Sequence, residues 1–121
     1  MNLSEKLKSC ADPLDARLRM ASGRVWVKIH HSRTGETVLA VCDEDLLGKR
    51  IEVSEGFTVE VSEAFYGGAL IARDELDKYI VQAKILNLLG EVAVSYMVEK
   101  GVVPERAVIR VGDIPHVQIY L

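Results

Sequence analysis

The segment from residue 74 to residue 100 constrains the fold more than any other part of the chain. Its apolar side chains recur at intervals of three and four residues, which is the spacing of one face of an α-helix. Gly101 is a typical C-terminal stop, and Pro104 prevents the helix from continuing. Asn87 and Gly90 are poor choices for a helix interior, so they predict a bend or a close contact there. We therefore predict one long central helix.

Short strand-like segments predict three β-hairpins around that helix; most of them alternate apolar and polar residues, and residues 37–42 are almost continuously apolar. The hairpins lie at 24–42, 51–61 and 106–121, and Gly35 supplies the positive φ that the first turn needs. Residues 43–48 are typical of a single helical turn, and residues 62–68 of a loop. The predicted fold is α+β, with a mostly antiparallel sheet of short hairpins packed on the long central helix.

The length of 121 residues fits one domain, which we place at 23–121. Residues 1–22 are a separate N-terminal extension, because Pro13 interrupts their apolar spacing and Ser22-Gly23 breaks the chain. The extension is either a short helix over 13–20 or a dispensable leader that precedes a natural start at Met20. Both alternatives stay open.

Composition excludes several classes of protein. The net charge of −3 argues against a dedicated nucleic-acid binder, although it allows a small local basic face. No apolar run approaches the roughly 20 residues of a membrane span, and the first residues lack the apolar core of a signal peptide. The two cysteines form neither a disulfide framework nor a zinc motif, so we expect free thiols, a cytoplasmic location, no metal and no cofactor.

The first strand carries a candidate RNA-binding face. Trp26, Lys28 and His30 share its polar side, and an aromatic ring beside two cations suits an RNA base or a phosphate. The alternative is an ordinary solvent face on which Trp26 is covered by another part of the chain. The negative net charge favours this alternative.

Other candidate ligand-binding residues are scattered along the chain. Tyr66 precedes Gly67 and Gly68, whose bare backbone could approach a ligand, or which could form a turn with positive φ. Asn87 is expected on the long helix, and Gln118 on the polar face of the last strand. These residues are candidates by type, because their spacing matches no phosphate-binding loop.

Three residues are weak candidates for catalysis. Cys42 ends a strand where a helical turn begins, a position that can lower the pKa of a thiol, although a buried inert cysteine is more common. Glu91 is either a general base or a core carboxylate paired with Lys28, Arg110 or His116. His116 would have to converge with these groups. Scattered ligands of this kind do not predict a metal site.

Five blocks of sequence form a recognisable set, and they are Trp26–His30, Leu39–Asp43 with Leu47–Lys49, Phe65–Gly68, Asn87–Glu91 and Ile114–Gln118. Together they resemble the small archaeal family called domain of unknown function 424. They cover about residues 24–121 in the family's order, and the extension before them departs from the family pattern. The resemblance implies a shared fold and an archaeal, cytosolic setting, but no activity; a link to translation or RNA is an association only.

From the sequence, the first hypothesis is a non-enzymatic cytosolic binding module that joins RNA or a translation-associated protein. The second is a small enzyme with a site made of Cys42, Glu91 and His116. The third is a protein-binding adaptor or homodimer, because the apolar surface of one long helix could exceed what a small sheet covers. We expect no interaction with a membrane.

Overall fold

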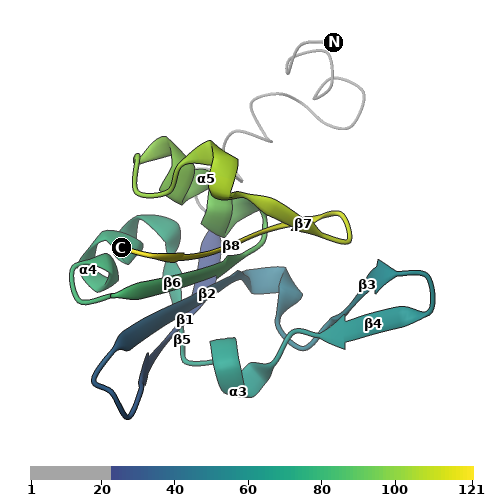
Figure 1. The fold of residues 1–121 in the computed structure, drawn as a ribbon, viewed down its shortest axis with the longest axis horizontal. Helices are drawn as coiled ribbons and strands as arrows, with labels where there is room; N and C mark the ends of the chain where they lie inside the picture. Colours follow the sequence, from purple (N-terminus) through teal and green to yellow (C-terminus); the bar gives the residue numbers. More distant parts are fainter. Residues whose placement is uncertain (1–22) are drawn as a thin grey trace.

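A computed structural model describes residues 23–121, which form a mixed β-sheet with short helices packed on it (Figure 1). The predicted extension at 1–22, with its short helix and the alternative start at Met20, lies outside the described residues. The strands are β1 (Arg24–His31), β2 (Thr37–Asp43), β3 (Arg50–Ser54), β4 (Phe57–Glu60), β5 (Ala69–Ala72), β6 (Ile85–Leu89), β7 (Ile109–Val111) and β8 (Ile114–Tyr120). The α-helices are α3 (Glu63–Tyr66), α4 (Leu76–Ile80) and α5 (Glu91–Glu99), and the 3-10 turns are η1 (Glu44–Leu46), η2 (Arg73–Glu75) and η3 (Glu105–Ala107).

Six strands form one sheet in the order β5-β1-β2-β6-β8-β7, and β3 pairs with β4 in a separate two-stranded sheet. The pairing of β1 with β2, of β3 with β4 and of β7 with β8 confirms the three predicted hairpins. β2 and β6 run parallel, so the large sheet is mixed. β5, which was not predicted, extends the sheet along the outer edge of β1.

The predicted long helix from 74 to 100 is wrong. The segment folds into η2, α4, β6 and α5, so the fold is mainly sheet with short helices. β6 lies between β2 and β8 and is covered on both faces, and such a strand needs apolar residues at successive positions. Gly90 then takes a φ of 114° at the start of α5. The apolar residues that suggested one helix thus belong to a buried strand flanked by helices.

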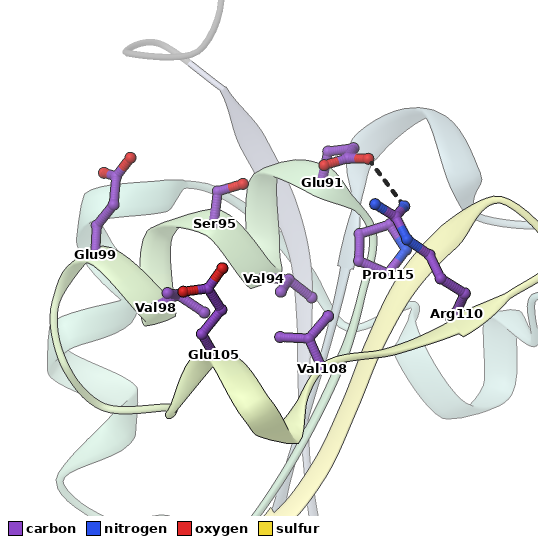
Figure 2. Close-up of a pocket in the computed structure, with 9 residues that line it drawn as sticks. All are labelled: Glu91, Val94, Ser95, Val98, Glu99, Glu105, Val108, Arg110 and Pro115. Carbon is purple, nitrogen blue, oxygen red and sulfur yellow. Dashed lines mark hydrogen bonds and ion pairs between the residues drawn. The ribbon is translucent and has the colours of Figure 1, made fainter.

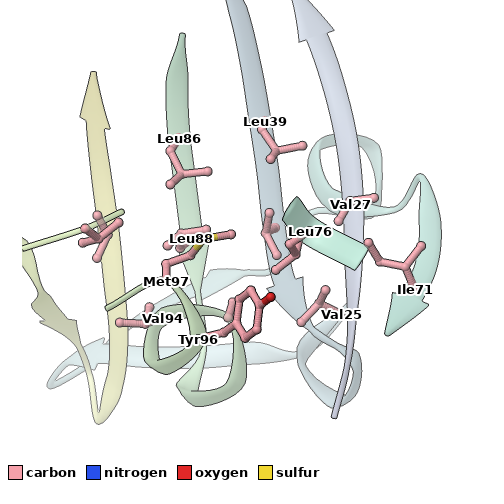
Figure 3. Packing of buried hydrophobic residues seen from close by; sticks show 14 residues of the cluster. Val25, Val27, Leu39, Ile71, Leu76, Leu86, Leu88, Val94, Tyr96 and Met97 are labelled. Carbon is pink, nitrogen blue, oxygen red and sulfur yellow. The ribbon is translucent and has the colours of Figure 1, made fainter. Parts of the chain in front are cut away.

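The larger core lies between the six-stranded sheet and the helices α4 and α5. Leu39, Leu86 and Leu88 project from the sheet, and Leu76 of α4 and Met97 of α5 pack against them (Figure 3). All five side chains are fully buried. Burial of each such side chain contributes about 1.5–3 kcal/mol before its entropic cost, so this layer fixes the position of both helices.

The opposite face of the sheet is covered in part by α3 and by the base of the β3–β4 hairpin. Cys42 and Leu89 are paired neighbours on this face. Tyr66, Ile51 and Val61 pack with them in a second, smaller core. This face is the one to which the ligand-binding candidates of β1, β6 and β8 belong, because strand side chains alternate between faces.

Candidate binding surface

Two of the polar side chains of β1 contact η1. The Arg24 guanidinium forms an ion pair with the Glu44 carboxylate, and both side chains remain about half exposed. Trp26 Nε1 donates a hydrogen bond of 3.3 Å to the backbone carbonyl of Glu44. Trp26 is partly buried, and the N–H of its indole ring is already used in this hydrogen bond within the protein.

The other two polar side chains of β1 contact α3. Lys28 Nζ donates to the Ala64 carbonyl oxygen at 2.8 Å, and His30 Nε2 donates to the Phe65 carbonyl oxygen at the same distance. The His30 ring also stacks on the Phe65 ring, with centroids 4.8 Å apart. These contacts hold α3 against the sheet, and RNA binding by the face of β1 stays a prediction.

The two glycines after α3 allow close backbone packing. A Cβ at Gly67 would lie 2.5 Å from the Glu63 carbonyl oxygen, and a Cβ at Gly68 would overlap the Val27 carbonyl oxygen. Neither glycine is among those with positive φ, so the expected turn conformation is wrong. The bare backbone of Gly68 faces β1, and its role is to let the chain pass from α3 into β5.

The structure brings three of the predicted ligand-binding residues into one hydrogen-bonded chain. The Tyr66 hydroxyl donates to Asn87 Oδ1 at 2.6 Å, and Asn87 Nδ2 donates to Gln118 Oε1 at 3.3 Å. Burial raises the pKa of Tyr66 to about 12, so its hydroxyl remains a donor at neutral pH. Because both amide oxygens already accept a hydrogen bond, the exposed Gln118 presents amide N–H donors to solvent.

Cys42 is a free thiol buried in the second core. It has no exposed surface, and burial, followed by the charges of Asp43 and Asp45, raises its pKa to about 12. A nucleophilic cysteine needs the thiolate, which this environment disfavours. The environment of Cys42 therefore matches the alternative of a small buried apolar residue.

Glu91 and His116 form their hydrogen bonds with groups other than the Cys42 thiol. Glu91 begins α5 and is exposed, so the alternative of a core carboxylate is wrong. Its Oε1 lies 3.5 Å from Nη1 of Arg110, one of the expected partners. His116 Nδ1 donates to the Leu88 carbonyl oxygen at 2.8 Å. Within residues 23–121, no hydrogen bond joins any two members of the predicted catalytic set.

An open groove of about 470 Å³ lies between α5 and the segment that leads into β7 (Figure 2). Val94, Val98 and Val108 line its floor, and Glu91 stands at one end beside Arg110. Neither Cys42 nor His116 lines this groove, so it does not unite the predicted catalytic residues.

One buried carboxylate has a role that the sequence did not indicate. Asp43, at the end of β2, accepts hydrogen bonds from the backbone N–H groups of Val92 and Ala93 at 3.0 and 2.9 Å. It thereby caps α5 from a distant part of the chain. Burial raises its pKa above the usual 3.8, while the two backbone bonds act in the opposite direction. Gly90 is required beside it, because a Cβ there would lie within 2.6 Å of both carboxylate oxygens.

The β3–β4 hairpin, residues 50–60, projects from the six-stranded sheet and is called the arm below (Figure 1). Val59 is paired with Ile51, and Phe57 follows on the same face by strand alternation. Ile51 is buried at the base of the arm. Farther out, Val53, Val59 and Phe57 are 36%, 46% and 68% exposed. The apolar face of the arm therefore continues from the core into solvent.

The base of the arm is fixed by backbone contacts. The Val61 N–H donates to the Lys49 carbonyl oxygen at 2.8 Å, and the Gly48 N–H donates to the Val61 carbonyl oxygen at 2.9 Å. The turn between β7 and β8 packs against β3, where a Cβ at Gly112 would lie 2.5 Å from the Glu52 carbonyl oxygen. The arm is thus attached to the second core.

The described part of the chain holds neither a metal-binding cluster nor a membrane-spanning helix. Residues 23–121 contain no group of three His, Cys, Asp or Glu side chains arranged to hold a metal ion. None of the helices described is both long enough and apolar enough to span a bilayer.

These features define a small α+β domain with a mixed six-stranded sheet and a projecting hairpin arm. The model of the family described as protein of unknown function DUF424 matches residues 31–121. The chain belongs to that family, which confirms the family expected from the sequence, although the match starts at the end of β1.

The chain is similar to a crystal structure of an uncharacterized conserved protein from Methanopyrus kandleri. The two are 38% identical, with a TM-score of 0.71, and the alignment covers 80% of this chain and 90% of the other. The archaeal source agrees with the setting that the resemblance implied. No curated protein matches the chain.

Proposed function

We propose that this protein is a non-enzymatic binding module whose arm docks its apolar face on a partner protein. The observation that carries the proposal is the exposure of Val59 and Phe57 on one face of the arm, with Val53 also exposed at the register irregularity between Glu52 and Ser54. Apolar side chains gathered on one projecting element are typical of an interaction site, whereas scattered ones need no explanation. An aromatic side chain is also a common anchor of protein interfaces.

The attachment of the arm supports the same proposal. Its base is hydrogen-bonded through Lys49 and Val61, and Ile51 is buried in the core. An element held in its binding conformation loses less entropy on association than a flexible segment does. The arm therefore offers Phe57 as a preorganised contact.

We expect the partner of the arm to be a protein rather than RNA. The cations predicted for RNA binding, Lys28 and His30, each donate to a carbonyl oxygen of α3. The net charge of −3 also opposes phosphate binding. The proposal keeps the cytosolic setting expected from the sequence, and the buried free thiol of Cys42 agrees with a reducing compartment.

The test is affinity capture from an extract of the source cells with three forms of the full chain. These are the unmodified protein, Phe57→Ser, and the control Val81→Ser, which changes an apolar side chain that is 85% exposed outside the arm. We expect one partner protein to be captured by the unmodified and Val81→Ser forms and to be at least tenfold depleted with Phe57→Ser.

Three results would contradict the proposal. They are capture of no protein by the unmodified chain, equal capture by Phe57→Ser, and a homodimer in light scattering that Phe57→Ser dissociates. The last result would assign the arm to a second copy of the chain. Retention of bulk tRNA at low salt that is lost on Trp26→Ala and Lys28→Ala would instead favour the RNA hypothesis.

A further inference from the structure

The inference rests on the proposed function and concerns the chemistry of the partner. The arm has two chemically different faces, because Glu52 and Thr58 are paired on the side opposite to Ile51 and Val59. Glu60 lies on that polar side as well, and Glu55 lies in the turn. The face of the arm opposite to the apolar one therefore carries carboxylates.

The charge on the outer part of the arm has one sign. Residues 51–60 contain three glutamates, Glu52, Glu55 and Glu60, and no lysine or arginine. All three are exposed, and none of them takes part in an ion pair between described residues. Arg50 pairs with Glu60 in the strand register, so these two opposite charges lie together at the base of the arm, and Glu52 and Glu55 are the charges farther out. The negative potential of the outer arm is thus directed at solvent.

We infer that the partner of the arm is a basic protein, whose apolar groove receives Phe57 and whose lysine or arginine side chains border that groove. Charges around an apolar contact steer association and reject partners of the wrong sign. At physiological salt the screening length is about 8 Å, so carboxylates on a short hairpin act together on an approaching surface. Glu52 and Glu55, the charges of the outer arm, would therefore favour a cationic rim.

The same charges disfavour other occupants of the arm. Nucleic acids and anionic lipid surfaces would bring phosphate groups toward the glutamates, which costs free energy. A second copy of the chain would bring a second set of three carboxylates toward the first. A basic protein surface with an apolar groove suits both the apolar face of the arm and its glutamates.

The experiment compares charge-neutral variants of the full chain in the same capture assay, at 50 and 300 mM salt. The arm variant carries Glu52→Gln, Glu55→Gln and Glu60→Gln, which keep the shape of each side chain. The control carries Glu75→Gln, Glu99→Gln and Glu105→Gln, which neutralise three exposed glutamates elsewhere. Equal melting temperatures would verify that both variants fold.

We expect capture by the arm variant to be about tenfold weaker at 50 mM salt, with little difference at 300 mM and no change in the control. Mass spectrometry should identify the captured protein as basic. Loss of capture with Phe57→Ser but not with the arm variant would overturn the inference and leave the proposed function standing. Capture that is insensitive to both changes, or absent from the unmodified chain, would overturn both.

Discussion

The carboxylate of Asp43, at the end of β2, accepts a hydrogen bond of 2.9 Å from the backbone N–H of Ala93 in α5. This contact joins residues 50 positions apart in the chain. It explains why a short helix starts directly after β6, since the first N–H groups of a helix have no partner inside the helix. The sheet thus supplies the N-terminal cap of α5.

The Gly90→Ala substitution should lower the free energy of unfolding by about 3–4 kcal/mol, because it combines strain at positive φ with overlap on Asp43. Gly35→Ala is the control, since Gly35 has a φ of 87° and open space around it. It should cost about 1–2 kcal/mol. Urea unfolding of both variants checks the difference, and equal losses would argue against the close contact.

Asp43→Asn should destabilise the protein by about 1–2 kcal/mol at neutral pH, because an amide group can accept only one of the two backbone bonds. Burial raises the pKa of Asp43 in the folded state, so the folded protein binds this proton up to a higher pH than the unfolded chain does. The stability advantage of the wild type should therefore shrink as the pH rises above 3.8 through the folded pKa. An advantage that grows with pH would mean that the helix N–H groups outweigh burial.

Tyr66→Phe should cost about 1 kcal/mol of stability, because it removes the donor to Asn87 Oδ1 in a partly buried position. Tyr120→Phe is a matched control, as the side chain of Tyr120 is 74% exposed, and should change the stability little. A double-mutant cycle of Tyr66→Phe with Asn87→Ala should give a coupling energy of about 0.5 kcal/mol or more. Strict additivity would show that the hydrogen bond contributes nothing.

Cys42 should resist alkylation in the folded protein. Its pKa of about 12, compared with 9 for an ordinary thiol, lowers the thiolate fraction roughly a thousandfold. Iodoacetamide at pH 8, followed by mass spectrometry of a Cys10→Ser form, should label Cys42 only after unfolding. Rapid labelling of the folded protein would restore Cys42 as a candidate nucleophile.

The hairpins could be predicted from the sequence because their strands alternate and their turns contain glycine. Residues 85–89 could not be assigned in the same way, since the run Ile-Leu-Asn-Leu-Leu suits both a buried strand and a buried helix. Only the pairing of β6 with β2 and β8 decides between them. Gly90, which looked like a bend inside a helix, marks the boundary between β6 and α5.

The candidate site was predictable by residue type but not by arrangement. Tyr66, Asn87 and Gln118 were all expected to bind ligand, and they do contact one another. The contact between Asn87 and Gln118 depends on the antiparallel pairing of β6 with β8, in which the two residues are register partners, and no local pattern encodes that pairing. The exposure of Phe57 was equally hidden, because an alternating strand has the same sequence pattern whether its apolar face is buried or bare.

The most direct test of the proposed docking role is photocrosslinking at position 57. The full chain would carry p-benzoylphenylalanine in place of Phe57 or, as the control, in place of Val81, which is even more exposed. Each form would be irradiated in an extract of the source cells. The proposal predicts an adduct with one basic protein from position 57 only. No adduct, the same adduct from position 81, or an adduct between two copies of the chain would contradict it.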